Sequence, residues 1–196
     1  MEKEIKRQTE DIRTIRTKRD LANSLEQLLM KKDIDEISIK DITDNALISK
    51  NTFYNNFQDK NELLLFLFAR YKESLIVNIK PLLEKNFRPK RLMTFKKCLE
   101  ITVHFFYTTD LPFSKIIEND SSRVIFYNLN LFVQDLLKKF DLNYHILTNK
   151  AKEEVMIPFY AGAFSNVLYF SYKNHVSLTE KDMVKNVFRL AFPVVE

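Results

Sequence analysis

The sequence predicts an all-α fold, chiefly because it contains so few turn-forming residues. Its 196 residues include a single glycine, Gly162, and five prolines. Sheets need many tight turns, and turns with a positive φ are built mostly from glycine or asparagine. Apolar residues also recur at helical spacing along much of the chain. With 45% hydrophobic and 29% charged residues, the chain has the composition of a folded globular protein with one domain or two small ones.

The first expected helix covers about residues 11–32, because apolar residues in its second half recur at i, i+3, i+4 and i+7. The acidic segment DIDE at 33–36 ends this helix. A short helix then continues as far as Ala46. Ser38 precedes it and Asp41 follows three residues later, which is the pattern of a capping box with the shorter acid.

A turn at 47–49 separates this short helix from the next one. Ser49 carries the hydroxyl of an N-cap, and the second short helix is expected to run through Phe57. Asp59 then caps a longer helix, with Glu62 completing another capping box. These closely spaced starts predict a group of short helices near the amino terminus.

The rest of the chain is expected to form helices at about 91–108, 121–140, 150–174 and 180–192. Pro158 lies inside the third of these or near its start, so we expect a kink or a late start there. Pro81 and Pro89 mark a break around the basic segment KNFRPKR at 85–91. A solvated loop is the favoured interpretation of this segment, and contact with DNA phosphates or an acidic ligand is the alternative.

The composition argues against several classes of function. One glycine cannot build the phosphate-binding loops of nucleotide-binding folds, which need two or three. Cys98 is the only cysteine, which fits a reducing compartment. His104, His145 and His175 lie far apart and have no metal-binding spacing. We therefore expect no catalytic residues, no metal site and no cofactor.

No membrane association is expected. The most apolar stretch, from Ile157 to Tyr172, is interrupted by Ser165 and Asn166 and falls short of the roughly 20 residues that span a bilayer. The amino-terminal MEKEIKRQTE is charged throughout and has no apolar signal-peptide core. The expected location is the cytoplasm, in association with the nucleoid.

The segment SKNTFYNNF at 49–57 combines amides and aromatic rings in a way that suits neither a core helix nor a solvated one. On a helix, Phe53 and Phe57 share one face, supported by Ile48 from the turn. The polar side chains lie elsewhere: Lys50, Asn51, Tyr54 and Asn55 point away from the rings, and Thr52 and Asn56 flank them. This pattern is typical of a helix-turn-helix, whose second helix enters the major groove. Asparagine can bond adenine, lysine can reach guanine, and threonine and tyrosine hydroxyls can hold phosphates.

The net charge of +5 does not by itself indicate nucleic-acid binding. Residues 1–72 hold 14 Lys and Arg against 13 Asp and Glu, so this part contributes only +1. The interpretation therefore depends on where particular residues lie. Three amphipathic helices packed for their own sake are the alternative, and periodicity alone does not decide between the two.

The segment ISIKDITDNALISKNTFYNNFQDKNELL at 37–64 resembles the DNA-binding domain of the TetR family of bacterial transcriptional regulators. The resemblance includes TFY at 52–54, Phe57 and DK at 59–60. RTIRTKRDL at 13–21 is similar to the first helix of that family. Spacing and residue types agree over three helices.

This resemblance implies a two-domain, all-α architecture. A three-helix helix-turn-helix domain at 1–72 would be joined by a long helix to a helical dimerisation and ligand-binding domain at 73–196. The implied DNA-binding residues are Thr17, Lys18, Ser38, Lys40, Ser49, Lys50, Asn51, Thr52, Tyr54, Asn55, Asn56 and Lys60. Lys60, at the start of the long helix, would sit on a phosphate. Leu47 stands where the family usually has a turn glycine, so the turn must avoid a positive φ or carry strain.

The resemblance also implies a homodimer formed through about residues 150–192. Gly162, between Ala161 and Ala163, makes a small-residue patch where two helices could approach closely. An ordinary buried helix with small residues is the alternative. A symmetric pair is favoured because one helix-turn-helix offers few DNA contacts.

A ligand site is suggested more weakly by the aromatic segment CLEITVHFFYTTDLPF at 98–113. His104 and Tyr107 could be polar points in a pocket for a small apolar or aromatic ligand. The favoured alternative is that the rings form a core and His104 is a core or boundary histidine.

The combined interpretation is a homodimeric repressor that binds a double-stranded, palindromic DNA operator and is released by a small-molecule ligand. One alternative is a ligand-blind coactivator or protein-interaction regulator of the same family. Another is a helical carrier of small molecules without a DNA function. The sequence does not predict the operator, the ligand or the sign of regulation.

Overall fold

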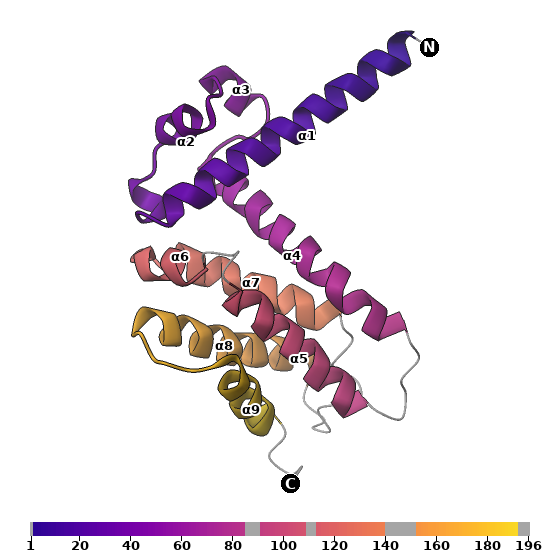
Figure 1. The fold of residues 1–196 in the computed structure, drawn as a ribbon, viewed down its shortest axis with the longest axis vertical. Coiled ribbons are helices and arrows are strands. Elements are labelled where there is room, and N and C mark those ends of the chain that lie inside the picture. The colour runs from indigo at the N-terminus through magenta and orange to yellow at the C-terminus, as the bar shows by residue number, and fades with distance from the viewer. Residues whose placement is uncertain (1, 85–90, 109–112, 140–151, 192–196) are drawn as a thin grey trace.

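The computed structural model describes residues 2–84, 91–108, 113–139 and 152–191, which are mainly helical and contain no β-strand (Figure 1). The described elements are α1 (Glu2–Leu29), the 3-10 helix η1 (Ile34–Glu36), α2 (Ile39–Ala46), α3 (Lys50–Tyr54), α4 (Lys60–Glu84), α5 (Arg91–Tyr107), α6 (Phe113–Asn119), α7 (Val124–Lys139), α8 (Glu153–Lys173) and α9 (Glu180–Ala191). The all-α prediction is therefore confirmed. Most of the basic segment at 85–91, and His145, lie outside the described residues.

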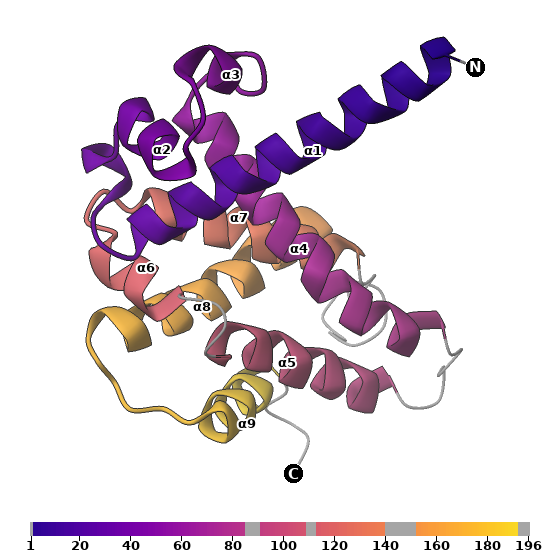
Figure 2. The same cartoon turned by 45° about the horizontal axis from the view of Figure 1, so that its top comes forward.

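Helix α4 connects the two parts of the molecule. Helices α1, α2 and α3 gather around its start, and α5 and α7 pack against it. Helices α8 and α9 lie below, and α6 packs against α1 and α8 (Figure 1). In the lower part, α7 packs along α8 and α5 packs against α9, an arrangement that Figure 2 shows from a second direction. The long connecting helix predicted from the sequence is thus present.

Several helix boundaries differ from the sequence-based expectation. Helix α1 begins at Glu2, well before residue 11. Pro81 does not interrupt α4 but lies inside its last turn, so its missing N–H removes one helical hydrogen bond near the end of the helix. Pro158 likewise lies inside α8. Helix α6 was not predicted at all, because its seven residues are too few for a periodic pattern to emerge.

The apolar core of the upper part is continuous with that of the lower part. Leu21 and Leu25 of α1, Ile42 of α2, Phe53 of α3 and Leu63 of α4 have no exposed surface. Burying each of these side chains contributes roughly 1.5–3 kcal/mol relative to exposure. The predicted apolar stripe of the first helix is therefore the surface on which the short helices are held.

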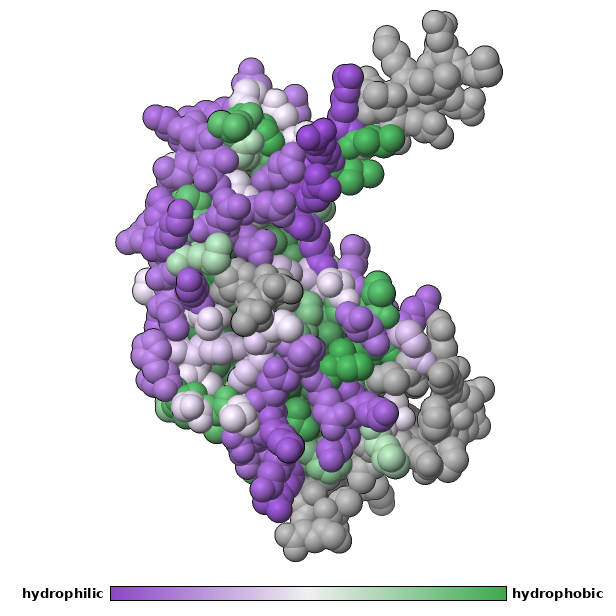
Figure 3. Space-filling view, in the orientation of Figure 1, coloured by the Kyte–Doolittle hydropathy of each residue, from purple (hydrophilic) through white to green (hydrophobic). Residues whose placement is uncertain are grey.

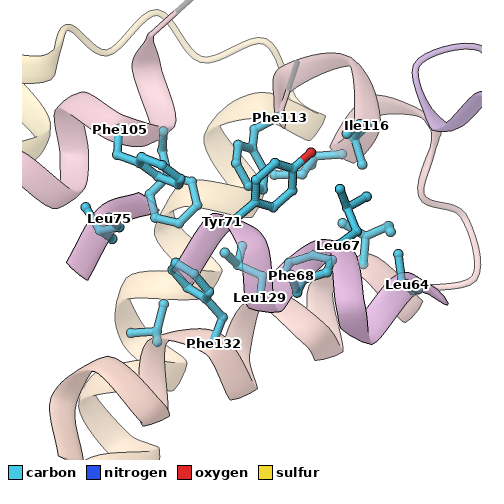
Figure 4. Close-up of a cluster of buried hydrophobic side chains, with 14 of the residues drawn as sticks. Leu64, Leu67, Phe68, Tyr71, Leu75, Phe105, Phe113, Ile116, Leu129 and Phe132 are labelled. Carbon is cyan, nitrogen blue, oxygen red and sulfur yellow. The ribbon is translucent and has the colours of Figure 1, made fainter. Parts of the chain in front are cut away.

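The lower part is built around aromatic rings that converge on α4. Tyr71 lies 5.0 Å from Phe113 of α6 and 6.4 Å from Phe105 of α5, measured between ring centroids (Figure 4). Its hydroxyl donates to Glu26 of α1 at 2.7 Å, and burial, followed by the Glu26 charge, raises the pKa of Tyr71 well above its usual range. One residue of α4 thus belongs to the lower core and also ties α4 to α1.

A buried carboxylate joins the two parts. Asp33, just before η1, is 6% exposed, and its Oδ2 accepts from Ser121 N at 2.6 Å, Ser121 Oγ at 2.7 Å and Ser122 N at 2.9 Å. Its Oδ1 accepts from Ser122 Oγ at 3.0 Å. Burial alone would raise the pKa of Asp33, but these bonds and one from the Asp35 N–H hold it well below its usual range. We call Asp33, Ser121 and Ser122 the interdomain clamp.

The junction between α6 and α7, which carries the two serines of the interdomain clamp, is also held by α8. The Tyr169 hydroxyl donates to the Asp120 carbonyl at 2.7 Å, and Lys173 Nζ donates to the same carbonyl at 3.1 Å. The Asp120 carboxylate caps the start of α7 by accepting from the N–H groups of Ile125 and Phe126. A continuous set of hydrogen bonds therefore runs from α8 through this junction to the upper part.

Candidate nucleic-acid interface

Helix α2 begins with the predicted capping box. The Asp41 N–H donates to Ser38 Oγ at 3.1 Å, and the Ser38 N–H donates to Asp41 Oδ2 at 2.9 Å. The bonds that the Asp41 carboxylate accepts from the Ser38 N–H and the Ser38 hydroxyl, with Lys32 Nζ at 3.2 Å, lower the pKa of Asp41 to about 2. On the side facing α1, the Ser24 hydroxyl donates to the Ile42 carbonyl at 2.8 Å. Both the start of α2 and its orientation on α1 are thus fixed.

The turn between α2 and α3 carries backbone strain. Leu47 has φ 56° and ψ 40°, in the left-handed region, and its side chain is 93% exposed. This conformation costs a residue with a Cβ roughly 1–2 kcal/mol. With leucine in place of glycine, the turn was expected either to avoid a positive φ or to carry strain. The positive φ of Leu47 shows that it carries strain. The turn is closed by the Ile48 N–H, which donates to the Thr43 carbonyl at 2.9 Å.

Helix α3 is anchored by rings and capped by a serine. Phe53 is fully buried and Phe57 is 3% exposed, with their ring centroids 6.0 Å apart, so the predicted anchoring face is confirmed. The Ser49 hydroxyl accepts from the Thr52 N–H at 3.1 Å and lies 2.8 Å from Thr52 Oγ1. The helix ends at Tyr54 rather than Phe57, and Asn56 Nδ2 bonds the Thr52 carbonyl at 2.8 Å. The pair of hydroxyls shares one hydrogen bond, which leaves one hydroxyl proton to donate outward.

The outer side of α3 presents four exposed side chains, which we call the recognition face: Lys50, Asn51, Tyr54 and Asn55. The side chains of Lys50, Asn51 and Asn55 have no hydrogen bond to the described residues, and Tyr54 makes only an edge contact with Phe53 at 5.5 Å. The surface around α2 and α3 is largely hydrophilic (Figure 3). The structure therefore brings together, exposed and unpaired, the groups that the sequence predicted to contact bases.

Two other predicted DNA-binding residues have roles inside the protein. Lys60 Nζ donates to the Ile34 carbonyl at 2.7 Å and the Ile37 carbonyl at 3.1 Å, so its ammonium is occupied by η1. Lys60 therefore ties the start of α4 to η1. The sequence predicted that this ammonium would contact a phosphate instead. Lys18 Nζ lies 5.4 Å from the centre of the Phe57 ring, a cation–π contact. The remaining predicted residues are exposed or half-buried: Thr17, Ser38, Lys40, Ser49, Thr52 and Asn56.

The two predicted ligand-binding residues do not lie together in an apolar interior. The His104 side chain is 64% exposed, and its Nδ1 lies 3.1 Å from Glu180 Oε2 of α9. Tyr107 is half-buried beside Tyr172, and burial raises its pKa. The neighbouring rings of Phe105 and Phe106 are core residues. The alternative interpretation, a boundary histidine beside an aromatic core, describes this segment better.

A second exposed surface runs along α8. Val155, Phe159 and Phe170 are 60–67% exposed, and Ala163 between them is also exposed. At spacings of four, four and seven residues they share one side of the helix. Gly162 lies beside this side, half-buried, and a Cβ there would make only ordinary contact with Asn130. We call Val155, Phe159, Ala163 and Phe170 the α8 apolar stripe.

Two kinds of feature are absent from the residues that the structure describes. None of the described helices is long and apolar enough to cross a membrane. Within the same residues, no group of three His, Cys, Asp or Glu side chains is placed to hold a metal ion. Cys98 is buried, and burial raises the pKa of its thiol to about 11.

Sequence reasoning missed the interdomain clamp and the role of Lys60. Asp33 and its serine partners are 88 and 89 residues apart, and Lys60 reaches carbonyls more than 20 residues away. No local spacing signals such contacts. From the sequence, Asp33 is interpreted only as part of a helix end.

The structure contains a capped helix-turn-helix whose second helix is polar and exposed, carried on a larger helical body. This arrangement is typical of helix-turn-helix regulators. Residues 23–67 match the family model described as "Bacterial regulatory proteins, tetR family", so the helix-turn-helix region is that of the TetR family, as the resemblance predicted.

Solved structures share the fold of the whole chain. One from Syntrophomonas wolfei, described as TetR-family, is 17% identical with TM-score 0.66, covering 92% of this chain and 97% of that one. The dihydroxyacetone kinase operon activator DhaS is 19% identical with TM-score 0.57, covering 91% and 96%. RolR in complex with resorcinol is 18% identical with TM-score 0.59, covering 92% and 89%. No curated protein sequence matches this chain.

Proposed function

We propose that the protein is a sequence-specific DNA-binding transcriptional regulator that acts as a homodimer on a palindromic operator. The observation that carries this proposal is the recognition face. Its four side chains are exposed, three of them have no hydrogen bond to the described residues, and the helix is fixed by two buried rings and a serine cap. Amides and a lysine held rigidly in this way are suited to base edges.

The roles of individual residues follow from their positions. Lys50 and Asn51, in the first turn of α3, are the candidates for base contacts, because the amino-terminal residues of a recognition helix enter the groove first. Thr52 and Tyr54 have hydroxyls suited to phosphates on either side. Asn55, at the end of the helix, would bond the backbone or an adenine.

The α8 apolar stripe supports the homodimer. Exposed rings and a valine aligned on one helix side cost free energy in water unless another surface covers them. A second copy of the chain would cover the stripe symmetrically. It would also place two recognition helices on one duplex, which α3 needs because it has only five residues.

The interdomain clamp supports control of DNA binding by a small molecule. Hydrogen bonds connect α8 to the α6–α7 junction, and the clamp connects that junction to η1. A ligand that shifted the packing around α4 to α8 would change the separation of the two recognition helices. Ligand and operator would then weaken each other by the same factor. A bound ligand in the similar structure of RolR agrees with this role, which makes repression with release by a ligand our preferred mode.

Activation without a ligand is the second candidate. The similar structure of DhaS is named an operon activator, and the aromatic rings near α4 are packed against each other as core. In this case the carboxy-terminal surface would recruit another protein. A ligand that lowers operator affinity would exclude this candidate.

Selection from a random duplex library tests the proposed function. We expect the wild-type protein to enrich an inverted repeat, with affinity that falls steeply with salt. The Thr52→Ala/Tyr54→Ala variant should enrich nothing, while Lys115→Gln, on the exposed side of α6, should enrich the same repeat. If the wild type enriched no sequence even after unfolding and refolding to remove a bound ligand, the proposal would be wrong.

A further inference from the structure

Helix α1 continues well beyond the helices that it supports. Lys18 of α1 contacts the group of helices around α3, since the Lys18 ammonium lies over the Phe57 ring. Helix α1 begins sixteen residues earlier, at Glu2. In both ribbon views this part projects clear of the molecule, at the same end as α3 and opposite α9 (Figures 1 and 2). Packing within the chain does not account for a helix of this length.

The base of the projection, residues 12–19, is basic, whereas residues 2–11 beyond it hold three cations and four acids. The segment IRTIRTKR at 12–19 holds four cations and no acid, whereas residues 1–72 as a whole are nearly neutral. Arg13 and Arg16 are exposed. Asp20 lies 3.9 Å from Arg16 and 3.6 Å from Arg19, but Arg13 has no ion pair or hydrogen bond with the described residues. We call residues 12–19 the basic arm.

The direction of Arg13 follows from helix geometry. Ser24 marks the side of α1 that turns toward α2, because its hydroxyl donates to the Ile42 carbonyl. Residues 13, 17 and 24 have i, i+4, i+11 spacing, so Arg13 and Thr17 lie on that same side. At about 1.5 Å per residue, Arg13 lies roughly 7 Å beyond Lys18 along the axis, about two base-pair steps.

We propose that the basic arm binds DNA phosphates outside each half-site, with Arg13 as its principal contact and Arg16 as a second. This inference rests on the proposed DNA-binding function and extends it to flanking DNA. Guanidinium groups bind phosphates well, and a duplex that entered along α3 would bring its backbone past the projecting helix. Because phosphates are the same in every sequence, the arm adds affinity without changing base preference.

Operator duplexes of two lengths test the arm: the selected inverted repeat alone, and the repeat with about six further base pairs on each side. On the longer duplex, Arg13→Gln/Arg16→Gln should bind on the order of tenfold more weakly than wild type. For this variant, the slope of the logarithm of affinity against the logarithm of salt concentration should be smaller in magnitude by roughly 0.9 for each phosphate that it no longer neutralises. On the shorter duplex the two proteins should bind alike, and base preference should be the same on both.

Controls separate failure of the arm from failure of the proposed function. Arg13→Lys should keep most of the flanking affinity, and Lys115→Gln should behave as wild type. An unchanged melting temperature in each variant would show that folding is intact. Equal binding and equal salt dependence of wild type and Arg13→Gln/Arg16→Gln on the longer duplex would overturn the arm alone. Absence of sequence-selective binding by the wild type would overturn both proposals.

Discussion

Helices α3 and α8 both expose side chains to solvent, but the chemistry that they expose is opposite. On α3 Phe53 is buried, and the recognition face with its amides, lysine and tyrosine hydroxyl points outward. On α8 the outward side carries Phe159, Phe170 and a valine. Polar groups held rigidly in water suit a hydrated, charged partner such as DNA, whereas an apolar stripe is stabilised by a surface like itself. The recognition face of α3 and the α8 apolar stripe are therefore suited to different partners.

The largest expected effect comes from removing the base contacts of α3. Lys50→Ala/Asn51→Ala should weaken binding of the selected operator by about 4 kcal/mol per dimer, roughly 1,000-fold, because each protomer loses two contacts. Fluorescence anisotropy measures this loss. Both side chains are exposed and unbonded, so the melting temperature and the oligomeric state should not change. Binding within threefold of wild type would contradict the role of α3.

A charge on the α8 apolar stripe should weaken formation of the dimer. Phe159→Glu should weaken self-association by about 3 kcal/mol, roughly 100-fold, because a carboxylate would be buried between apolar surfaces. Sedimentation equilibrium measures the dimer constant. Val77→Glu places the same change on an exposed valine of α4 and should leave self-association unaltered. A dimer of normal strength in Phe159→Glu would place the interface elsewhere.

Removing the interdomain clamp should lower stability. Asp33→Ala leaves four donors of Ser121 and Ser122 without an acceptor, which should cost about 2–3 kcal/mol of unfolding free energy. Asp35→Ala, at an exposed neighbour, is the matched control in urea unfolding. An unchanged midpoint in Asp33→Ala would show that the clamp adds no net stability.

The clamp also predicts a pH dependence. The pKa of Asp33 is lower in the folded than in the unfolded protein, so its contribution is complete above about pH 4 and is lost as pH falls further toward the folded pKa. Unfolding free energies measured between pH 5 and pH 2 should therefore fall more steeply for wild type than for Asp33→Ala. Parallel curves would contradict this assignment.

The smallest effect is expected at the strained turn. Leu47→Gly should raise stability by about 0.5–1 kcal/mol, because glycine adopts the left-handed conformation without a Cβ penalty. Leu47→Ala keeps that penalty and should change stability little, since the leucine is exposed. Urea denaturation distinguishes the two, and a glycine variant less stable than the alanine variant would contradict the strain.

The features predicted correctly are those whose partners lie close in sequence. The capping box of Ser38, the cap at Ser49 and the ring pair Phe53 and Phe57 all involve residues three or four apart, so spacing alone indicates them. The recognition face follows, because burying Phe53 and Phe57 forces the polar residues outward. Its interpretation as a DNA-binding surface depends on the family resemblance as well.

The features missed depend on contacts distant in sequence. Lys60 resembles a phosphate ligand because it begins a helix, yet the fold brings the carbonyls of η1 within reach of its ammonium. For His104 the favoured interpretation, a core or boundary histidine, agrees with its position on α5, but the sequence does not indicate its partner Glu180 on α9. Neither outcome is encoded in local spacing, since both depend on which helix packs nearby.

The most direct test of the central claim is a base-by-base binding profile of Asn51→Ala on the selected operator. Each position of a half-site is replaced in turn, and affinities are measured for the variant and the wild type. If α3 reads base edges, the variant should lose discrimination of about 1–3 kcal/mol at one or two positions and keep it at the others. A uniform loss across all positions, or none, would contradict the claim that α3 specifies the sequence.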